Sequence, residues 1–201
     1  MIEVEKKFLL TEEEIEKLLL DAVFLEEIEL EDVYYDKESL ELIKADKYLR
    51  KRNGKYEFKI PVGVREEFDV DRYFELEDED SILKELNLEG GSIEKEMSKV
   101  GLVPLATIRS VRRKYKHGDF GIDIDKTDFG YSIVEIEVMI PEEESTINAS
   151  HRIVDFALSI GLEVAPEDDV RGKLLEYLYR EKRGVYDEVI NYWRSVGATR
   201  L

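Results

Sequence analysis

The stretch from Gly121 to Val138 constrains the fold more than any other part of the chain, because its residues alternate strictly on both sides of a turn. The apolar positions are Ile122, Ile124, Val134, Ile136 and Val138. The acidic positions are Asp123, Asp125, Glu135 and Glu137. Alternation with a period of two is typical of β-strands, and the Asp-Phe-Gly triplet at 128–130 is suited to a tight turn. The pattern therefore predicts a β-hairpin with one apolar face and one acidic face.

Four carboxylates on one face of two paired strands repel one another, so they need bulk water, a cation or basic neighbours. For a hairpin taken alone, a solvated acidic face is the commoner arrangement. The polar residues of the other predicted strands therefore decide between a wet surface and an enclosed site.

Six further segments alternate in the same way, and we expect strands at residues 2–9, 25–36, 47–52, 56–60, 68–76 and 105–115. Asn53-Gly54 is a strong two-residue hairpin signal between the third and fourth of these strands. The charge of the polar positions differs from strand to strand. Acidic positions include Glu3 and Glu5, and basic positions include Arg50, Arg52, Lys59, Arg109 and Arg113.

The helices are expected mainly in the second half of the chain. Thr11 and Glu14 form a capping-box signature before an early helix, and two short helices are expected near residues 81–87 and 92–100. Apolar periodicity predicts three more after Pro141, and no linker or internal repeat is visible. The sequence predicts an α+β fold in which eight antiparallel strands close into a β-barrel surrounded by helices.

Composition excludes several classes of protein. The net charge of −18 argues against a nucleic-acid binder that uses a broad basic surface. Without cysteine, the chain has no disulfide, zinc-thiolate site or thiol nucleophile. No apolar run reaches the length of about 20 residues that a membrane helix needs, and no leader is visible, so a cytoplasmic protein is expected.

Closing these strands into a barrel would give an interior with carboxylates on one side and cations on the other. Carboxylate oxygens suit Mg²⁺ or Mn²⁺, whereas arginine and lysine side chains suit phosphate oxygens. The charge pattern therefore indicates a site for a metal-bound polyphosphate.

An ordered set of motifs resembles the CYTH superfamily, the triphosphate tunnel metalloenzymes. Glu3-Val4-Glu5-Lys6-Lys7 matches its E-x-E-x-K signature. The motifs that follow in order are Tyr34-Tyr35-Asp36, Ala45-Asp46, Leu49 to Arg52, Phe58-Lys59, Arg109-Ser110, Asp123 to Glu137 and Lys173-Leu174. The hairpin and the Tyr73-Phe74-Glu75-Leu76 strand look most like the thiamine triphosphatase branch. We expect a tunnel domain over residues 1–182 and a helical extension over 183–201, packed on that domain or used as a dimer contact.

The resemblance implies roles at the matching positions. The expected metal ligands are Glu3, Glu5, Asp123, Glu135 and Glu137. The expected triphosphate contacts are Lys7, Arg50, Arg52, Lys59, Arg109 and Lys173. Glu5 and Lys59 are the expected catalytic residues, with Lys59 assisting the leaving oxygen. Asp125, Arg112 and Arg113 are left outside this set. Candidates for contact with an organic cation at the tunnel mouth are Tyr35, Tyr48, Tyr73 and Glu75, although each tyrosine equally suits a core position.

The predicted function is metal-dependent hydrolysis of the terminal phosphate of a triphosphate, most readily thiamine triphosphate or tripolyphosphate. One alternative is a class IV adenylate cyclase, which would use the same cradle to convert ATP to cyclic AMP and pyrophosphate. Another is a non-catalytic polyphosphate-binding module. The expected partner is a small-molecule triphosphate rather than nucleic acid or membrane, and the chain is expected to be a monomer or a homodimer.

Overall fold

A computed structural model describes residues 1–63, 70–142, 144–164 and 170–197 of the chain. The strands in these residues are β1 (Ile2–Phe8), β2 (Val23–Asp36), β3 (Tyr48–Arg52), β4 (Lys55–Pro61), β5 (Asp71–Leu76), β6 (Val103–His117), β7 (Phe120–Thr127) and β8 (Ser132–Ile140). The helices are α1 (Glu12–Leu18), α2 (Glu41–Lys44), α3 (Glu79–Glu85), α4 (Ile93–Lys99), α5 (Thr146–Ser159), α6 (Lys173–Glu181) and α7 (Arg183–Ser195).

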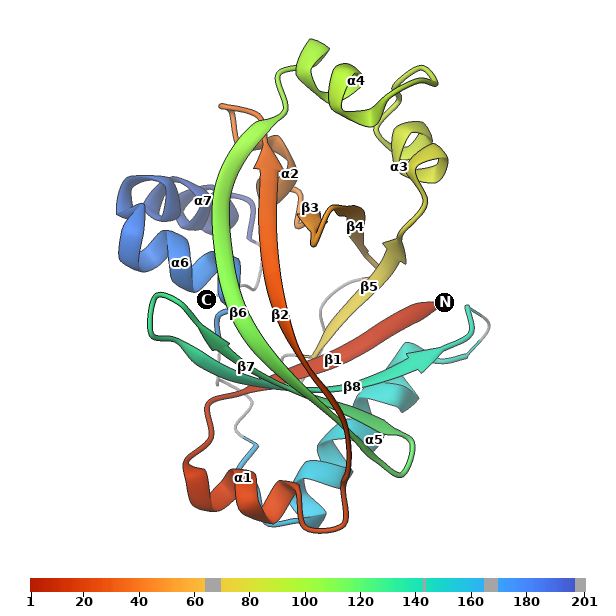
Figure 1. Ribbon diagram of the computed structural model, residues 1–201, viewed down its shortest axis with the longest axis vertical. Coiled ribbons are helices and arrows are strands. Elements are labelled where there is room, and N and C mark those ends of the chain that lie inside the picture. The colour runs from red at the N-terminus through yellow and green to blue at the C-terminus, as the bar shows by residue number, and fades with distance from the viewer. Residues whose placement is uncertain (64–69, 143, 165–169, 198–201) are drawn as a thin grey trace. The chain divides into compact units, whose positions relative to one another are not determined.

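The strands close into a barrel in the order β1-β5-β4-β3-β2-β6-β7-β8. The pairs β1–β8, β2–β3, β3–β4, β6–β7 and β7–β8 are all antiparallel. The long strands β2 and β6 run side by side in Figure 1. This architecture confirms the predicted α+β fold with a closed eight-stranded antiparallel barrel.

The chain divides into two compact units. Unit 1 contains Met1–Glu29, Val62–Tyr73 and Ser110–Lys173. Unit 2 contains Leu30–Pro61, Phe74–Arg109 and Leu174–Leu201. The strands β2, β5 and β6 each contribute residues to both units.

In unit 1 the apolar face of the predicted hairpin packs against a helix. Ile122 lies opposite Ile136 and Ile124 lies opposite Val134, and all four side chains are buried. Helix α5 contacts β1 and β8, as Figure 1 shows, and Ile153 is one of its buried apolar residues. Full burial of such an aliphatic side chain contributes about 1.5–3 kcal/mol, so this face fixes the register of the hairpin.

In unit 2 the Asn53-Gly54 turn joins β3 and β4 as predicted. Both turn residues have positive φ values, 46° and 87°, which is the conformation of a two-residue hairpin turn. One face of this hairpin contributes Leu49, Tyr56 and Phe58 to a core cluster that also contains residues of α3 and α4.

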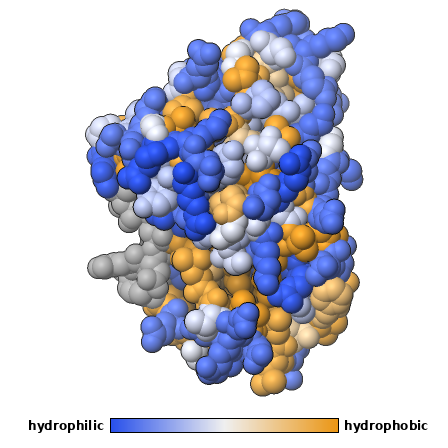
Figure 2. Space-filling model, turned by 60° about the vertical axis from the view of Figure 1, so that its left-hand side comes forward, coloured by the Kyte–Doolittle hydropathy of each residue, from blue (hydrophilic) through white to orange (hydrophobic). Residues whose placement is uncertain are grey.

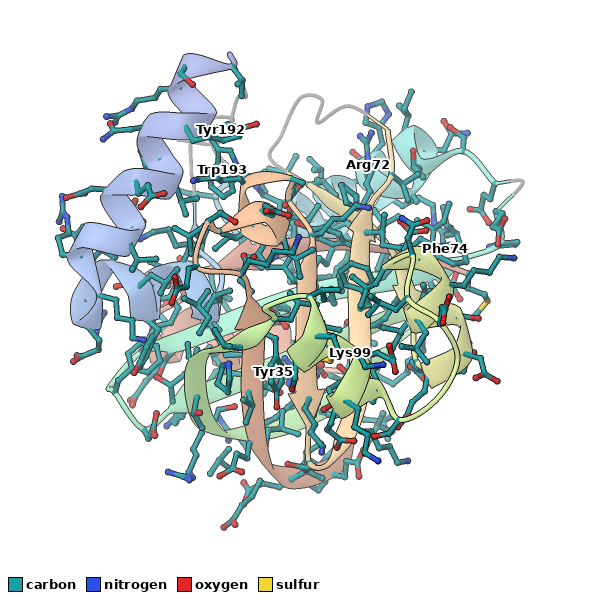
Figure 3. The ribbon with its side chains drawn as sticks, turned by 90° about the horizontal axis from the view of Figure 1, so that it is seen from above. Tyr35, Arg72, Phe74, Lys99, Tyr192 and Trp193 are labelled. Carbon is teal, nitrogen blue, oxygen red and sulfur yellow. The ribbon has the colours of Figure 1, made fainter. Side chains whose placement is uncertain are left out.

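The helical extension packs within unit 2, where α7 contacts α2. Trp193 is 2% exposed, and its indole N–H donates to the carbonyl of Lys44 at 3.0 Å. Tyr192, the neighbouring residue labelled in Figure 3, is 42% exposed and lies with its ring centroid 5.7 Å from Lys44 Nζ. The domain boundary at residue 182 stays a prediction.

The starts of α1, α3 and β5 can be compared with the starts that the sequence predicts. Thr11 and Glu14 form the predicted capping box at the start of α1. Helix α3 begins at Glu79, because the carboxylate of Asp78 caps it by accepting from the amide of Ser81. The predicted strand at 68–76 is observed from Asp71 onward, and residues 68 and 69 lie outside the described part of the chain.

No helix in the described residues is long and apolar enough to cross a membrane. The face shown in Figure 2 is mostly hydrophilic, and hydrophobic surface is concentrated toward its lower end. The side chains of Leu20, just after α1, and of Val23, Phe24 and Leu25, at the start of β2, are more than half exposed.

Candidate functional site

Three carboxylates from the two paired strands β1 and β8 form the centre of the candidate site in unit 1. Glu5 lies opposite Glu137 in the pairing, and Glu3, two residues earlier, lies on the same face of β1. One carboxylate oxygen from each of Glu3, Glu5 and Glu137 lies within 4.8 Å of the others. Burial, together with the negative charges of Glu3, Asp123, Glu5 and Glu135, raises the pKa of Glu137 to about 8. Such a group is suited to a bound cation, which would relieve the repulsion.

The acidic face of the β7–β8 hairpin is enclosed rather than solvated. Asp123 and Glu135 lie opposite each other and are 1% and 8% exposed. Asp123 Oδ1 is a buried side-chain oxygen that has no hydrogen-bond partner within the described part of the chain. Burial also raises the pKa of Asp123 above its ordinary value. An unsatisfied buried oxygen in an all-carboxylate donor set fits a hard divalent cation such as Mg²⁺ or Mn²⁺.

Arg112 is a buried base among these acids. Its Nε and Nη2 each donate at 2.7 Å to the two carboxylate oxygens of Asp125, and Nη2 also donates to Glu135 at 2.8 Å. Its Nη1 donates to Asp123. Burial opposes the charge of Arg112, but the contact with Asp125 and the charges of Glu135 and Asp123 hold its pKa well above its ordinary value. The guanidinium therefore fixes the positions of three carboxylates at once.

Two lysines of unit 1 also pair with carboxylates of this unit. Lys7 Nζ lies 2.6 Å from carboxylate oxygens of both Glu5 and Asp71. Lys173 Nζ lies 2.7 Å from Asp125 Oδ2 and 3.4 Å from Ser110 Oγ. Burial disfavours the charge of Lys7, but Asp71 and Glu5 raise its pKa well above the ordinary lysine value, so the ammonium form is retained.

The position of Lys173 depends on a tether just before α6. The hydroxyl of Tyr131 donates to the carbonyl of Arg171 at 2.6 Å. Tyr131 follows the turn between β7 and β8, and it is 6% exposed. This bond holds the backbone at Arg171, two residues before Lys173, against the hairpin that carries Asp125.

A second group of charges lies on one face of the β3–β4 hairpin in unit 2. Arg50 donates to Glu57 at 2.6 Å and lies 3.5 Å from Glu75. Arg52 makes a two-bond contact with the buried Asp32, at 2.6 and 2.8 Å. The remaining predicted residues of this face are Lys59 and Tyr48, which lie opposite each other in the strand pairing. Arginine forks of this kind match carboxylate and phosphate oxygens equally well.

The expected role of Arg109 is not supported by its position. Its side chain is 65% exposed and pairs with Glu31 at 2.6 Å, on the face of β6 opposite to that of Ser110 and Arg112. In β6, Arg112 pairs with Asp125 of β7, and Lys114 pairs with Asp123. The arginine of β6 that lies among the carboxylates is thus Arg112, which is outside the set of expected triphosphate contacts.

Of the aromatic candidates, Tyr35 takes the core position, which is one of the two positions that the sequence leaves open for it. Tyr35 shares the face of Leu49, its partner in the pairing, and packs against the core cluster near Tyr56. Tyr34, opposite Arg50, shares the charged face instead. Tyr73 is 3% exposed and has the same strand parity as Asp71 and Glu75 in β5. The face that each tyrosine takes depends on this parity, since a shift of one residue moves a side chain to the other face.

Sequence reasoning missed Asp71, Asp125 and Arg112. The alternation of Ser110, Arg112 and Lys114 in residues 105–115 carried the signal for Arg112, because these positions match the parity of the hairpin acids across the pairing. Asp125 carried the same parity signal as Asp123. The contact of Asp71 with Lys7 joins residues 64 positions apart, and no local pattern predicts it.

Comparisons with known proteins identify the family and the proteins that share the fold. The family model of the CYTH domain matches residues 1–168. A thiamine-triphosphatase from Homo sapiens is 29% identical over 94% of this chain and 90% of its own length. A solved structure of a conserved hypothetical protein from Pyrococcus furiosus is 25% identical, with a TM-score of 0.56 over 86% of this chain and 98% of that chain. A Hippeastrum protein described as a putative adenylyl cyclase with a dominant triphosphatase activity shares the fold at 18% identity, with a TM-score of 0.54 over 90% of this chain and 95% of that one.

Proposed function

We propose that this chain, which belongs to the CYTH domain family, hydrolyses the terminal phosphate of an organic or inorganic triphosphate with a divalent metal ion as cofactor. Thiamine triphosphate and tripolyphosphate are the proposed substrates, because a thiamine-triphosphatase aligns with nearly the whole chain. The observation that carries the proposal is the close group of carboxylates from β1 and β8, with three basic side chains in the same unit.

The proposed metal ligands come from the acidic residues of unit 1. They are Glu3, Glu5, Asp123, Glu135 and Glu137. All are oxygen donors, which favours Mg²⁺ or Mn²⁺ over softer metals. A divalent ion held there would neutralise charge on the transferred phosphoryl group and make a bound water more acidic.

The proposed triphosphate contacts are basic side chains. They are Lys7, Arg112 and Lys173 from unit 1, and Arg50, Arg52 and Lys59 from unit 2. Arg112 replaces Arg109 in this set because only Arg112 is buried among the carboxylates. Carboxylate ion pairs are formed by Lys7, Arg50, Arg52, Arg112 and Lys173, so phosphate oxygens would compete with carboxylates for the same donors.

In the proposed reaction, a water oxygen bonds to the terminal phosphorus while the bridging bond between phosphorus and oxygen breaks. Glu5 orients this water in line with the breaking bond and accepts the proton that the water loses. Lys59 donates a proton to the departing phosphate oxygen, and the arginines stabilise the charge that develops on the equatorial oxygens. No covalent intermediate is required.

An organic group on the substrate would contact residues next to the charged face of unit 2. Tyr48 shares that face with Arg50, and Glu75 lies 3.5 Å from the same guanidinium. An aromatic ring beside a carboxylate suits an organic cation such as a thiazolium. Tyr35 is left out of this proposal because it packs against the apolar core cluster. Tyr73 stays a proposed contact, because it has the same strand parity as Glu75 in β5.

Phosphate release from thiamine triphosphate, tripolyphosphate and ATP, measured with Mg²⁺ and with Mn²⁺, tests the proposal. We expect release that EDTA abolishes, and a fall of about 100-fold or more in kcat for Glu5→Gln and for Lys59→Ala. A Glu94→Gln variant, which changes an exposed carboxylate on α4, provides a matched control with unchanged activity.

Other products would identify the alternatives. Cyclic AMP and pyrophosphate from ATP would indicate a cyclase, in which the ribose hydroxyl rather than water is the attacking group. Tight binding of tripolyphosphate without turnover under either ion would indicate a binding module. Metal-independent phosphate release, or full activity in Glu5→Gln, would overturn the proposed mechanism.

A further inference from the structure

Gly121 differs from most glycines of the chain because neighbouring atoms, and not its backbone conformation, leave no room for a side chain. It lies within β7, directly opposite Glu137 of β8. Its φ is not positive, so any residue can adopt its extended backbone. Glycine in a strand costs about 0.5–1 kcal/mol relative to alanine, so its presence here needs another explanation.

The side chain of Glu137 occupies the space where a Cβ at position 121 would lie. A Cβ built on Gly121 would fall 2.9 Å from both Cγ and Oε1 of Glu137, and 3.3 Å from its Cδ. These separations are shorter than van der Waals contact, so the two groups cannot coexist in these positions. Glu137 therefore lies folded over the backbone of its strand partner.

The other glycine with a close neighbour also abuts the charged group of unit 1. A Cβ on Gly172 would lie 3.3 Å from Cε of Lys7, and Gly172 directly precedes Lys173. At the ten remaining glycines of the chain, an added Cβ would meet nothing closer than 3.6 Å. Close packing onto glycine is thus confined to the two positions that adjoin the proposed metal and phosphate ligands.

We propose that Gly121 is a positioning residue of the carboxylate group: it leaves the space that lets Glu137 direct its oxygens toward Glu3 and Glu5. An alanine at this position would push Glu137 into another rotamer and separate its oxygens from those of β1. The inference rests on the proposed function only in taking these three carboxylates as ligands of a divalent cation.

The first test compares Mn²⁺ binding by the wild type and by Gly121→Ala, measured by calorimetry and by the electron paramagnetic resonance signal of free Mn²⁺. We expect the affinity of Gly121→Ala to be lower by about 10-fold or more, as for other changes that reorient a metal ligand. Gly90→Ala is the matched control, because Gly90 also lacks a positive φ and has no atom within 4 Å of an added Cβ. Wild-type Mn²⁺ affinity in Gly121→Ala would overturn the inference.

The second test is a double-mutant cycle on thermal unfolding without metal. Gly121→Ala should lower the melting temperature in the wild-type background. In a Glu137→Ala background, where the three atoms nearest to the new Cβ are gone, the same change should leave the melting temperature unchanged or slightly higher. If Gly121→Ala alone does not fold, the double variant should still melt like Glu137→Ala. An equal loss of stability in both backgrounds would place the conflict elsewhere and overturn the inference.

The Glu137→Ala variant separates this inference from the proposed function. Loss of Mn²⁺ binding in Glu137→Ala, with wild-type binding in Gly121→Ala, would overturn the role of Gly121 alone. Wild-type Mn²⁺ binding in Glu137→Ala would overturn the proposed ligand set, whereas the coupling in the unfolding cycle would still support the steric relation between the two positions.

Discussion

Arg112 and Arg109 show how much depends on the face of a strand from which a single residue projects. The two arginines are three positions apart in β6, yet one is buried among three carboxylates and the other is two-thirds exposed beside Glu31. Their electrostatic surroundings differ accordingly. A buried ion pair that loses one partner leaves uncompensated charge, whereas an exposed pair contributes little.

Replacement of each arginine by methionine should therefore change the free energy of unfolding by very different amounts. Arg112→Met should lower the free energy of unfolding by about 3 kcal/mol or more and abolish phosphate release, because Asp123, Asp125 and Glu135 lose their shared donor. Arg109→Met should change the free energy of unfolding by less than about 1 kcal/mol. Urea unfolding of both variants at pH 7 measures the difference. Equal effects would show that the partition of β6 into buried and exposed faces is wrong.

Glu137 should make cation binding dependent on pH. Its pKa of about 8 means that the metal-free protein retains this proton at pH 7, whereas a bound cation requires the carboxylate. Binding should thus release about one proton at pH 7 and almost none at pH 9. Calorimetry with Mn²⁺ in buffers of different ionisation enthalpy measures this number, and Glu137→Gln should remove the difference between the two pH values.

The same shift sets the direction of the change in stability with pH. Because the folded-state pKa of Glu137 is raised, its folded form binds more protons than its unfolded form, and its contribution to stability is lost as pH rises toward 8. The metal-free protein should therefore melt at a lower temperature at pH 8 than at pH 6, and Glu137→Gln should reduce this difference. An unchanged pH dependence in Glu137→Gln would place the titrating group elsewhere.

Among the secondary-structure elements, α7 packs on the rest of unit 2 through three buried side chains. They are Val189, Ile190 and Trp193, and the indole N–H of Trp193 donates to the carbonyl of Lys44 at the end of α2. This hydrogen bond fixes the orientation of the ring.

Trp193→Ala should lower the free energy of unfolding by about 3–5 kcal/mol, and Trp193→Phe by less, because phenylalanine retains most of the apolar contact but loses the hydrogen bond. Tyr192→Ala, at the exposed neighbouring position, is the control and should cost less than about 1 kcal/mol. Circular dichroism should be used, since Trp193 is the sole tryptophan in the sequence. Similar losses for Trp193→Ala and Tyr192→Ala would contradict the docking of α7 through Trp193.

The elements themselves were largely predictable from alternation, caps and turn residues. The two faces of the hairpin at 121–138 are confirmed, with Ile122 opposite Ile136 on the apolar face, because both the apolar period and the turn residues agree. Helix α3 begins at Glu79 rather than at the predicted residue 81, because Asp78 caps it; aspartate and serine are both good caps, so the sequence does not distinguish Asp78 from Ser81. The structure places Arg109 on the exposed face of β6 and Tyr35 against the apolar cluster, because a motif gives spacing along the chain, whereas the face depends on parity relative to the partner strand.

At the scale of the whole molecule, the large negative charge favours any cation that binds the folded state preferentially. The net charge of −18 includes several carboxylates that are buried at the site. A divalent ion bound there would stabilise the fold by mass action, in addition to general screening by salt.

Mg²⁺ or Mn²⁺ should therefore raise the melting temperature beyond the effect of NaCl at matched ionic strength. At a concentration 100 times its dissociation constant, a ligand specific for the folded state contributes about 2.7 kcal/mol. Scanning calorimetry with the ions and with EDTA measures this effect, and the Glu3→Gln/Glu137→Gln variant should keep only the screening contribution. Equal shifts with NaCl and Mn²⁺ in the wild type would argue against a specific site.

The pairing of β1 with β8 brings Glu5 beside Glu137, which is 132 positions further along the chain, nearly two-thirds of its length. During synthesis on the ribosome, β1 must consequently wait for this neighbour until β8, which ends at Ile140, has emerged. Contacts between such distant segments slow folding, because a large loop must close before they form. The ligands from β1 thus acquire their partner from β8 late in synthesis, and a nascent chain that stops short of β8 lacks Glu135 and Glu137, two of the five proposed ligands.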